Sequence, residues 1–373
     1  REILKSDEAG ITESTIEIND SLFDENGAFV NDNYILPAED ESAKKLYIDR
    51  YLNFFGPNAL EGKNIGLYGH SAVGRDIIFE ILTNLGAKVS KLDYSDHFIP
   101  VDTEMVSEEM AAKGKEWNNN YHFDCLVTTD GDSDRPLLAD EEGSWCRADT
   151  TGIMVGKYLG IKTIVAPIGC NTALEKSKTF ENISRTKIGS PYVVEEMMRV
   201  KDKGLVPVAG YEANGGFLLG TEVNKNGKIL KALATRDAII VHLAIIMLAK
   251  ENGTTIKEMT SQLPKRFTQS LSLKGFPTEL SLKIIEKLSG GTFEEQKEKI
   301  QRDTGNVFGQ VKSVDLTDGL RITFENEDIV HFRPSQNSPE FRSYVESGSQ
   351  ERADKLAKQA LDIIEGWMNK PTN

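Results

Sequence analysis

The chain has 373 residues, 39% of them hydrophobic, and a formal net charge of −14 at pH 7. This length and apolar content are typical of about two to four globular domains and exclude a disordered or fibrous chain. The acidic balance argues against nucleic acid or an anionic membrane as a partner, because no basic field would attract phosphates from a distance. Any phosphate site must therefore be local.

The first predicted elements form a βαβ unit. They are a strand at 64–68, a loop at 69–74, an amphipathic helix at 75–85 that ends at Gly86, and a strand at 88–92. The loop, GHSAVG, could cradle a phosphate, although glycines at such a turn are more often structural.

A strand-like apolar run then leads into DGDSDRP, residues 130–136, in which Asp130, Asp132 and Asp134 alternate. Three carboxylates this close repel one another unless a cation lies among them, and a hard divalent ion with oxygen ligands fits. Arg135 adds a fixed positive charge beside them. We therefore expect a metal-assisted site for a phosphorylated substrate.

The loop also has features of three other kinds of segment: an EF-hand loop, a phosphatase motif and a solvated turn. An EF-hand needs glycine where Arg135 stands, and a helix rather than a strand before the loop. A haloacid-type phosphatase needs a Thr or Val that is missing here. A solvated acidic turn without a ligand stays open on these residues alone.

A second α/β unit is expected from residue 148 onward. Its elements are a helix at 148–159, a strand at 163–167, a helix at 192–201, a strand at 207–209, the loop GYEANGG at 210–216 and a helix at 237–251. The longest apolar run, 238–249, includes His242 and is too short to span a bilayer, so it predicts a buried helix and no membrane partner. The three cysteines, Cys125, Cys146 and Cys170, form no CxxC pair and are typical of core residues in a reducing cytoplasm.

The pattern changes after Pro264 to short strands with turns, which predicts an α+β module with an antiparallel sheet. Its expected elements are strands at 311–314, 320–324 and 329–332 and an amphipathic helix at 351–367. Between the last strand and that helix lies RPSQNSPEFR, residues 333–342, in which two arginines flank four small polar residues. Such donors suit a dianionic phosphate, whereas a solvated Arg/Ser turn is the ordinary alternative.

These three loops resemble, in the same order, loops of the α-D-phosphohexomutases. DGDSDRP resembles their metal loop, GYEANGG their sugar-specificity loop and RPSQNSPEFR their phosphate loop. With HSAVGRD they are most similar to bacterial phosphomannomutases. The resemblance covers about residue 40 to the C-terminus and implies consecutive mixed α/β second and third domains, followed by an α+β C-terminal domain with an antiparallel sheet.

The resemblance implies four segments. They are residues 1–38 as a remnant of the first domain with a linker, 39–147 as the second domain with the metal loop, 148–263 as the third domain with the sugar loop, and 264–373 as the C-terminal phosphate-binding domain.

It also implies residue roles. Asp130, Asp132 and Asp134 would bind Mg²⁺, and Arg135 would be catalytic. The implied substrate-binding residues are Glu212, Asn214, Lys187, Arg333, Ser335, Asn337 and Arg342. Two departures stand out: Gln336, Asn337 and Ser338 replace Gly, Thr and Glu of the phosphate loop, and Gly216 stands where some members have a histidine.

The activity that the resemblance implies is reversible phosphoryl transfer between the 1- and 6-positions of a hexose phosphate. The implied substrates are mannose 1-phosphate and mannose 6-phosphate, and the transfer would proceed through an enzyme phosphoserine and a hexose bisphosphate. Family members carry that serine in a first-domain loop like TASHNP, and this chain has no Ser-His dipeptide. We therefore expect a fragment without the nucleophile that is inactive alone. The alternative is a non-catalytic protein that binds a sugar phosphate or a divalent metal. Neither mannose-versus-glucose preference nor oligomeric state follows from the sequence.

Overall fold

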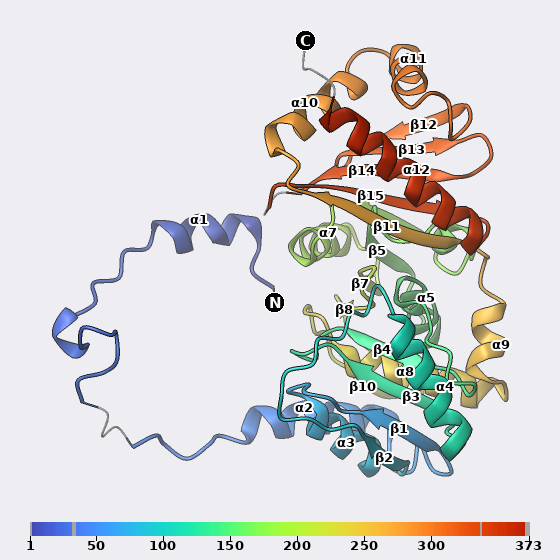
Figure 1. The fold of residues 1–373 in the computed structure, drawn as a ribbon. Coiled ribbons are helices and arrows are strands. Elements are labelled where there is room, and N and C mark those ends of the chain that lie inside the picture. The colour runs from blue at the N-terminus through green and yellow to red at the C-terminus, as the bar shows by residue number, and fades with distance from the viewer. Residues whose placement is uncertain (1, 32–34, 336–337, 370–373) are drawn as a thin grey trace.

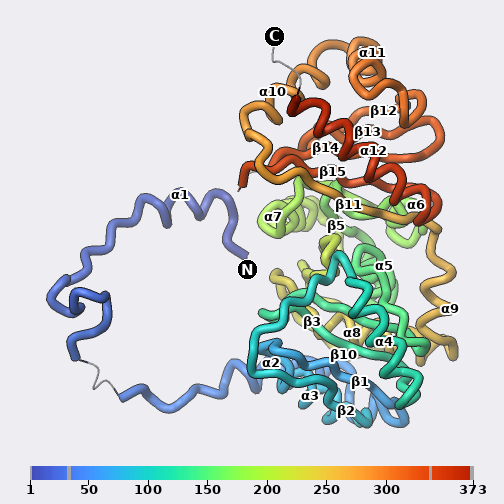
Figure 2. The backbone as a smooth tube through the Cα atoms, viewed as in Figure 1, coloured from blue at the N-terminus to red at the C-terminus, as the bar shows by residue number. Residues whose placement is uncertain are grey.

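The computed structural model describes residues 2–31, 35–335 and 338–369. Its body holds three main β-sheets, and the N-terminal stretch leaves this body in a wide loop before it returns at α2 (Figure 1). That stretch carries α1 (Lys5–Glu13) and the 3₁₀ helix η1 (Asp20–Leu22), whose side chains are exposed or half-buried. The backbone trace in Figure 2 follows the same path.

The first sheet has the strand order β2-β1-β3-β4. The elements around it are α2 (Ser42–Phe55), β1 (Asn64–Tyr68), α3 (Arg75–Asn84), β2 (Lys88–Leu92), α4 (Glu108–Tyr121), β3 (Cys125–Thr129) and β4 (Pro136–Ala139). β1 pairs in parallel with β2 and β3, whereas β4 runs antiparallel to β3. The expected βαβ unit is confirmed, and the metal loop is the turn between β3 and β4.

The apolar run before the metal loop starts at Phe123, but the strand itself begins at Cys125. The carboxylate of Asp124 accepts hydrogen bonds from the backbone N–H of Asn64 at 2.7 Å and from Lys63 Nζ at 3.1 Å. Asp124 therefore fixes the start of β3 instead of extending it.

The second sheet repeats this topology in the order β6-β5-β7-β8. The elements in this part of the chain are α5 (Ala148–Leu159), β5 (Thr163–Pro167), α6 (Ala173–Lys176), β6 (Asn182–Thr186), α7 (Ser190–Asp202), β7 (Val208–Tyr211), β8 (Phe217–Leu219), β9 (Val223–Lys225), β10 (Lys228–Leu230), α8 (Ala238–Asn252) and α9 (Ile256–Ser261). β9 and β10 pair only with each other, as a separate antiparallel sheet. β8 is again the antiparallel strand. The sugar loop between β7 and β8 thus occupies the position that the metal loop has in the first sheet.

A shared apolar core joins these two sheets. It includes buried residues of α2, α3, α5 and α8, and α8 is buried over most of its length, as the apolar run predicted. No helix among the described residues is both long and apolar enough to cross a membrane. Cys125, Cys146 and Cys170 are free and buried in this part of the molecule, and burial raises the pKa of each thiol.

The third sheet is antiparallel, with the order β11-β15-β14-β13-β12. Its elements are β11 (Phe267–Lys274), α10 (Thr278–Ser289), α11 (Phe293–Asp303), β12 (Val311–Asp315), β13 (Leu320–Phe324), β14 (Ile329–Pro334), β15 (Glu340–Ser347) and α12 (Gln350–Met368). It has its own core, to which α12 contributes Leu356, Ile364 and Trp367. The expected fold class is confirmed, whereas the limits of the four segments remain a prediction.

Candidate active site

The metal loop is closed by the β3–β4 ladder, whose last pair is Thr129 and Pro136. The carboxylate oxygens of Asp130, Asp132 and Asp134 lie within 4.8 Å of one another. Arg135 Nε is 2.5 Å from Asp130 Oδ2, and the backbone N–H of Arg135 donates to Asp130 Oδ1 at 3.1 Å. The loop therefore holds three carboxylates together and fixes the arginine against the most buried of them.

The electrostatics of this loop suit a divalent cation. Burial raises the pKa of Asp130 and Asp134, and a hydrogen bond with Asp130 lowers the pKa of Asp132. Asp134 Oδ1 is buried and has no hydrogen-bond partner among the described residues. Gathered carboxylates with an unsatisfied oxygen fit a hard ion such as Mg²⁺, because they supply the oxygen ligands it prefers.

The sugar loop is a tight turn. The N–H of Glu212 donates to the carbonyl of Gly216 at 3.0 Å, and the side chain of Asn214 accepts from the N–H of Gly216 at 2.9 Å. Gly215 has a φ of 86°, which a residue with a side chain adopts only with strain. Thr103, from the segment between β2 and α4, donates to the carbonyl of Asn214 at 2.8 Å and holds the loop from the first sheet.

Glu212 is the buried acceptor of this loop, with 5% of its surface exposed. Burial raises the pKa of Glu212 to about 7, while Arg236 acts in the opposite direction and Glu104 adds to the rise. Glu212 Oε2 has no hydrogen-bond partner among the described residues. A buried acceptor left unsatisfied favours a ligand that brings hydroxyl donors.

Arg236 is a site residue that the sequence analysis missed. Its Nε lies 2.7 Å from Asp134 Oδ2, and its Nη1 lies 3.6 Å from Glu212 Oε2. It therefore links the metal loop to the sugar loop. The sequence offered one signal, an arginine directly before the acidic cap of an apolar helix.

In the phosphate loop, Arg333 and Arg342 are directly opposite partners in the β14–β15 ladder. Arg333 Nε lies 2.7 Å from Asp318 Oδ2, and Arg342 donates to Glu340 Oε2 from Nε at 2.9 Å and from Nη2 at 2.7 Å. Two like charges placed opposite each other destabilise a sheet unless they are compensated. Here Asp318 and Glu340 compensate the two charges, and the direct pairing places both arginine side chains on the same face of the sheet.

The other residues predicted for this loop are placed as follows. Ser335 is buried, and its hydroxyl lies 3.2 Å from that of Ser338. Asn337, together with Gln336, lies outside the described residues.

One cleft of about 480 Å³ connects the three sheets. Of the predicted residues, it brings together Glu212, Asn214 and Arg342; its lining also includes residues that were not predicted, namely Glu104, Arg147, Asp149, Arg321 and His331. The metal loop and Arg333 adjoin this cleft through Arg236 and Asp318 rather than line it.

Lys187, predicted to contact substrate, is exposed. Its Nζ lies 5.8 Å from the centre of the Tyr192 ring. Its neighbour Ile188 lines the cleft and donates its N–H to Asp318 at 3.0 Å. The backbone of this segment therefore contacts Asp318, the carboxylate partner of Arg333, and substrate contact by Lys187 stays a prediction.

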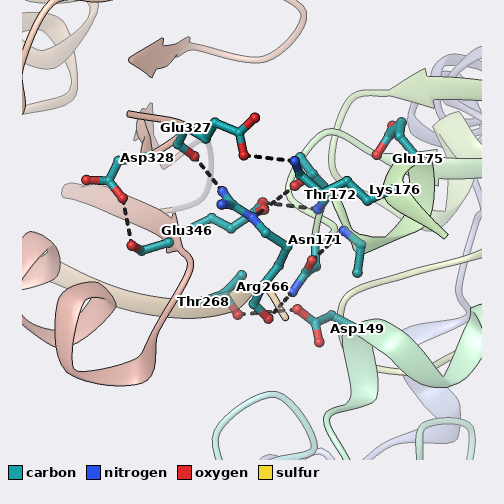
Figure 3. Close-up of polar contacts among 12 residues, drawn as sticks. Asp149, Asn171, Thr172, Glu175, Lys176, Arg266, Thr268, Glu327, Asp328 and Glu346 are labelled. Carbon is teal, nitrogen blue, oxygen red and sulfur yellow. Dashed lines mark hydrogen bonds and ion pairs between the residues drawn. The ribbon is translucent and has the colours of Figure 1, made fainter. Parts of the chain in front are cut away.

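A buried polar network holds the antiparallel sheet against the second sheet (Figure 3). Arg266 Nε lies 2.5 Å from Glu346 Oε1, and both side chains are 6% exposed. Glu346 also accepts from the backbone N–H and the hydroxyl of Thr172, and Asn171 donates to the carbonyl of Arg266 at 2.9 Å. This network therefore joins β15 and the residue directly before β11 in the antiparallel sheet to the segment between β5 and α6.

Comparisons with known proteins agree with this geometry. A family model described as phosphoglucomutase/phosphomannomutase, alpha/beta/alpha domain III, matches residues 147–267. The chain is 40% identical over 328 residues to a phosphomannomutase of Salmonella muenchen, covering 88% of this chain and 67% of that one. It is 36% identical over 326 residues to a phosphomannomutase of Sinorhizobium fredii, covering 87% and 67%. The chain thus spans about two thirds of the length of these relatives.

Solved structures share the fold at low sequence identity. A phosphoglucomutase/phosphomannomutase family protein of Burkholderia thailandensis superposes with a TM-score of 0.64 at 14% identity, covering 89% of this chain and 66% of that one. An N-acetylphosphoglucosamine mutase of Aspergillus fumigatus, solved with GlcNAc-6P and magnesium, superposes with a TM-score of 0.56 at 15% identity, covering 87% and 66%.

Proposed function

Because this chain belongs to the α-D-phosphohexomutase family, we propose that it provides the substrate-binding and metal-binding part of a phosphomannomutase-type isomerase. The substrate would be a hexose 1- or 6-phosphate, with mannose 1-phosphate and mannose 6-phosphate as the pair. The observation that carries the proposal is the cleft between the sheets, which has a buried carboxylate and amide on one wall and a phosphate-loop arginine on the other.

Each wall of the cleft has a chemical role in this proposal. Glu212 accepts hydrogen bonds from sugar hydroxyls, and Asn214 can donate and accept. Arg333 and Arg342 bind the phosphate that does not react, because charge-assisted hydrogen bonds from a guanidinium suit a dianion. One phosphate site could then serve both orientations of a bisphosphate, since either of its phosphates can occupy the arginine pair.

Asp130, Asp132 and Asp134 would hold Mg²⁺, which when bound offsets negative charge on a transferring phosphoryl group. The Aspergillus fumigatus mutase was solved in complex with magnesium and a sugar phosphate. Arg135, held on Asp130, keeps a second positive charge at this edge of the site. The contribution of these residues is positioning and charge stabilisation rather than covalent chemistry.

The phosphoryl-carrying serine is not among the residues of this chain that match the family loops, and no Ser-His dipeptide occurs in the sequence. We therefore propose that the 373-residue chain binds hexose phosphates but does not interconvert them. A non-catalytic sugar-phosphate-binding or metal-binding protein would behave in the same way, so the two proposals separate only when an upstream extension with a Ser-His loop is tested.

The experiment is an assay with mannose 1-phosphate and a hexose bisphosphate activator, run in parallel on the 373-residue chain and on any natural upstream extension. Binding of mannose 6-phosphate without turnover by the short chain, and turnover by the extended chain, would support the mutase. Turnover by the short chain would refute the missing-nucleophile reasoning and direct attention to Ser71, in the loop between β1 and α3. Failure of both forms to turn over substrate would favour the non-catalytic alternative.

A further inference from the structure

The guanidinium of Arg236 lies between two loops from different sheets. It pairs with Asp134 of the metal loop at 2.7 Å and approaches Glu212 of the sugar loop at 3.6 Å. Both carboxylates keep a buried oxygen without a hydrogen-bond partner among the described residues, Asp134 Oδ1 and Glu212 Oε2. The guanidinium of Arg236 thus lies between the carboxylates of Asp134 and Glu212 and links the metal loop to the sugar loop.

Gly216 provides the space that Arg236 occupies. A Cβ atom at position 216 would lie 2.8 Å from both Cγ and Cδ of Arg236, closer than real Cβ contacts. Any side chain at this position, including a histidine, would therefore displace the arginine. Gly216 and Arg236 form a matched pair, which gives a physical reason for the glycine at the position where some family members have a histidine.

The backbone of Arg236 is anchored from two directions. The next residue, Asp237, caps α8 and accepts hydrogen bonds from the hydroxyls of Tyr47, at 2.8 Å, and Tyr51. The N–H of Asp237 donates to the carbonyl of Phe217 in β8 at 3.0 Å. These contacts hold the backbone at Arg236 in place, so the position of its guanidinium is set before a ligand binds.

We propose that Arg236 is a positioning residue for sugar recognition, admitted by Gly216, which sets the place of the Glu212 carboxylate relative to the metal loop. The inference rests on the proposed function, since it assigns Glu212 to sugar hydroxyls. In this role Arg236 acts through Glu212 and Asp134, and the phosphate-loop arginines act independently of it.

The test measures binding of mannose 6-phosphate and of inorganic phosphate by calorimetry. Arg236→Ala should weaken mannose 6-phosphate binding about tenfold, because Glu212 loses the cation that approaches it, and leave phosphate binding unchanged. Arg236→Lys should recover part of this loss, because one amine can pair with only one of the two carboxylates. Arg199→Ala, which removes an exposed arginine paired with Glu196 on α7, is the charge-matched control and should have no effect.

Gly216→Ala provides a second route that leaves Arg236 in the chain. It should weaken sugar-phosphate binding in the wild type but add little in the Arg236→Ala background, where Cγ and Cδ are absent. Any residual effect would come from Asn214 Oδ1, which would lie 3.1 Å from the new Cβ. A double-mutant cycle of this kind separates the steric pairing from a backbone requirement for glycine.

The outcomes are distinct. Equal affinity of the wild type and Arg236→Ala, or an equal cost of Gly216→Ala in both backgrounds, would overturn the positioning role while leaving the proposed function intact. Parallel loss of sugar-phosphate and phosphate binding would also overturn it, because the effect would then be general. Absence of mannose 6-phosphate binding by the wild type would overturn the proposed function and this inference together.

Discussion

Arg342→Ala should weaken the binding of mannose 6-phosphate by about tenfold or more. A hydrogen bond to a charged group contributes about 1.5–3 kcal/mol. The Arg342 side chain is 40% exposed, so solvent screening favours the lower end of that range, about 1.5 kcal/mol or tenfold in Kd. The substitution also leaves the carboxylate of Glu340 without its guanidinium, and this charge would repel an incoming phosphate.

Calorimetry on the purified wild type and Arg342→Ala measures this change in affinity for mannose 6-phosphate. Free mannose should bind equally to both forms, and Glu340→Gln in the Arg342→Ala background should recover part of the affinity, because it removes the charge that Arg342 no longer compensates. Arg302→Ala in the same domain is the control, since that arginine is 68% exposed and its nearest carboxylate contact is 3.7 Å away. Unchanged affinity of Arg342→Ala for mannose 6-phosphate would refute the assignment of the phosphate loop.

Three further predictions concern the metal, the sugar acceptor and the domain contact. Asp132→Asn should bind Mg²⁺ more weakly in a titration, whereas Asp96→Asn, at a 98% exposed side chain, should match the wild type. The affinity for mannose 6-phosphate should rise as pH increases through about 7, because burial raises the pKa of Glu212 to about 7 and the ionised carboxylate is the stronger acceptor for sugar hydroxyls. Glu212→Gln should lose this pH dependence and keep only the pH dependence that comes from ionisation of the ligand's phosphate. Arg266→Met should lower the free energy of unfolding in urea by about 3–5 kcal/mol, because it leaves Glu346 charged and buried, and adding Glu346→Leu should reduce that cost.

The sequence predicts this fold well where hydrophobic periodicity is strong. The strands at 64–68, 88–92 and 163–167 and the helix at 148–159 match the structure residue for residue. β11 was missed because its sequence, FTQSLSLK, alternates apolar residues with Thr, Gln and Ser, and its side chains are half-buried at the edge of the sheet. Such a strand is stabilised by its pairing with β15, a contact about seventy residues away that local propensity does not reveal.

The candidate site was predictable where its chemistry is local in sequence. The three aspartates lie within five residues, so their gathering follows from the chain itself. Arg236 and Asp318 were missed because their partners are distant in sequence: Arg236 meets Asp134 only after both sheets have formed around a common core. Residue type and spacing do not predict such a long-range contact, which becomes visible only in the tertiary structure.

The burial of the three thiols gives this molecule an internal reporter of local opening. Cys125 lies in β3, Cys146 lies between the first two sheets, and Cys170 follows β5, so all three precede residue 171 and none belongs to the antiparallel sheet. A thiol reagent can modify a buried cysteine only while the surrounding structure is transiently open. Labelling kinetics would therefore follow fluctuations of the two α/β sheets alone, and would distinguish their opening from movement of the C-terminal sheet.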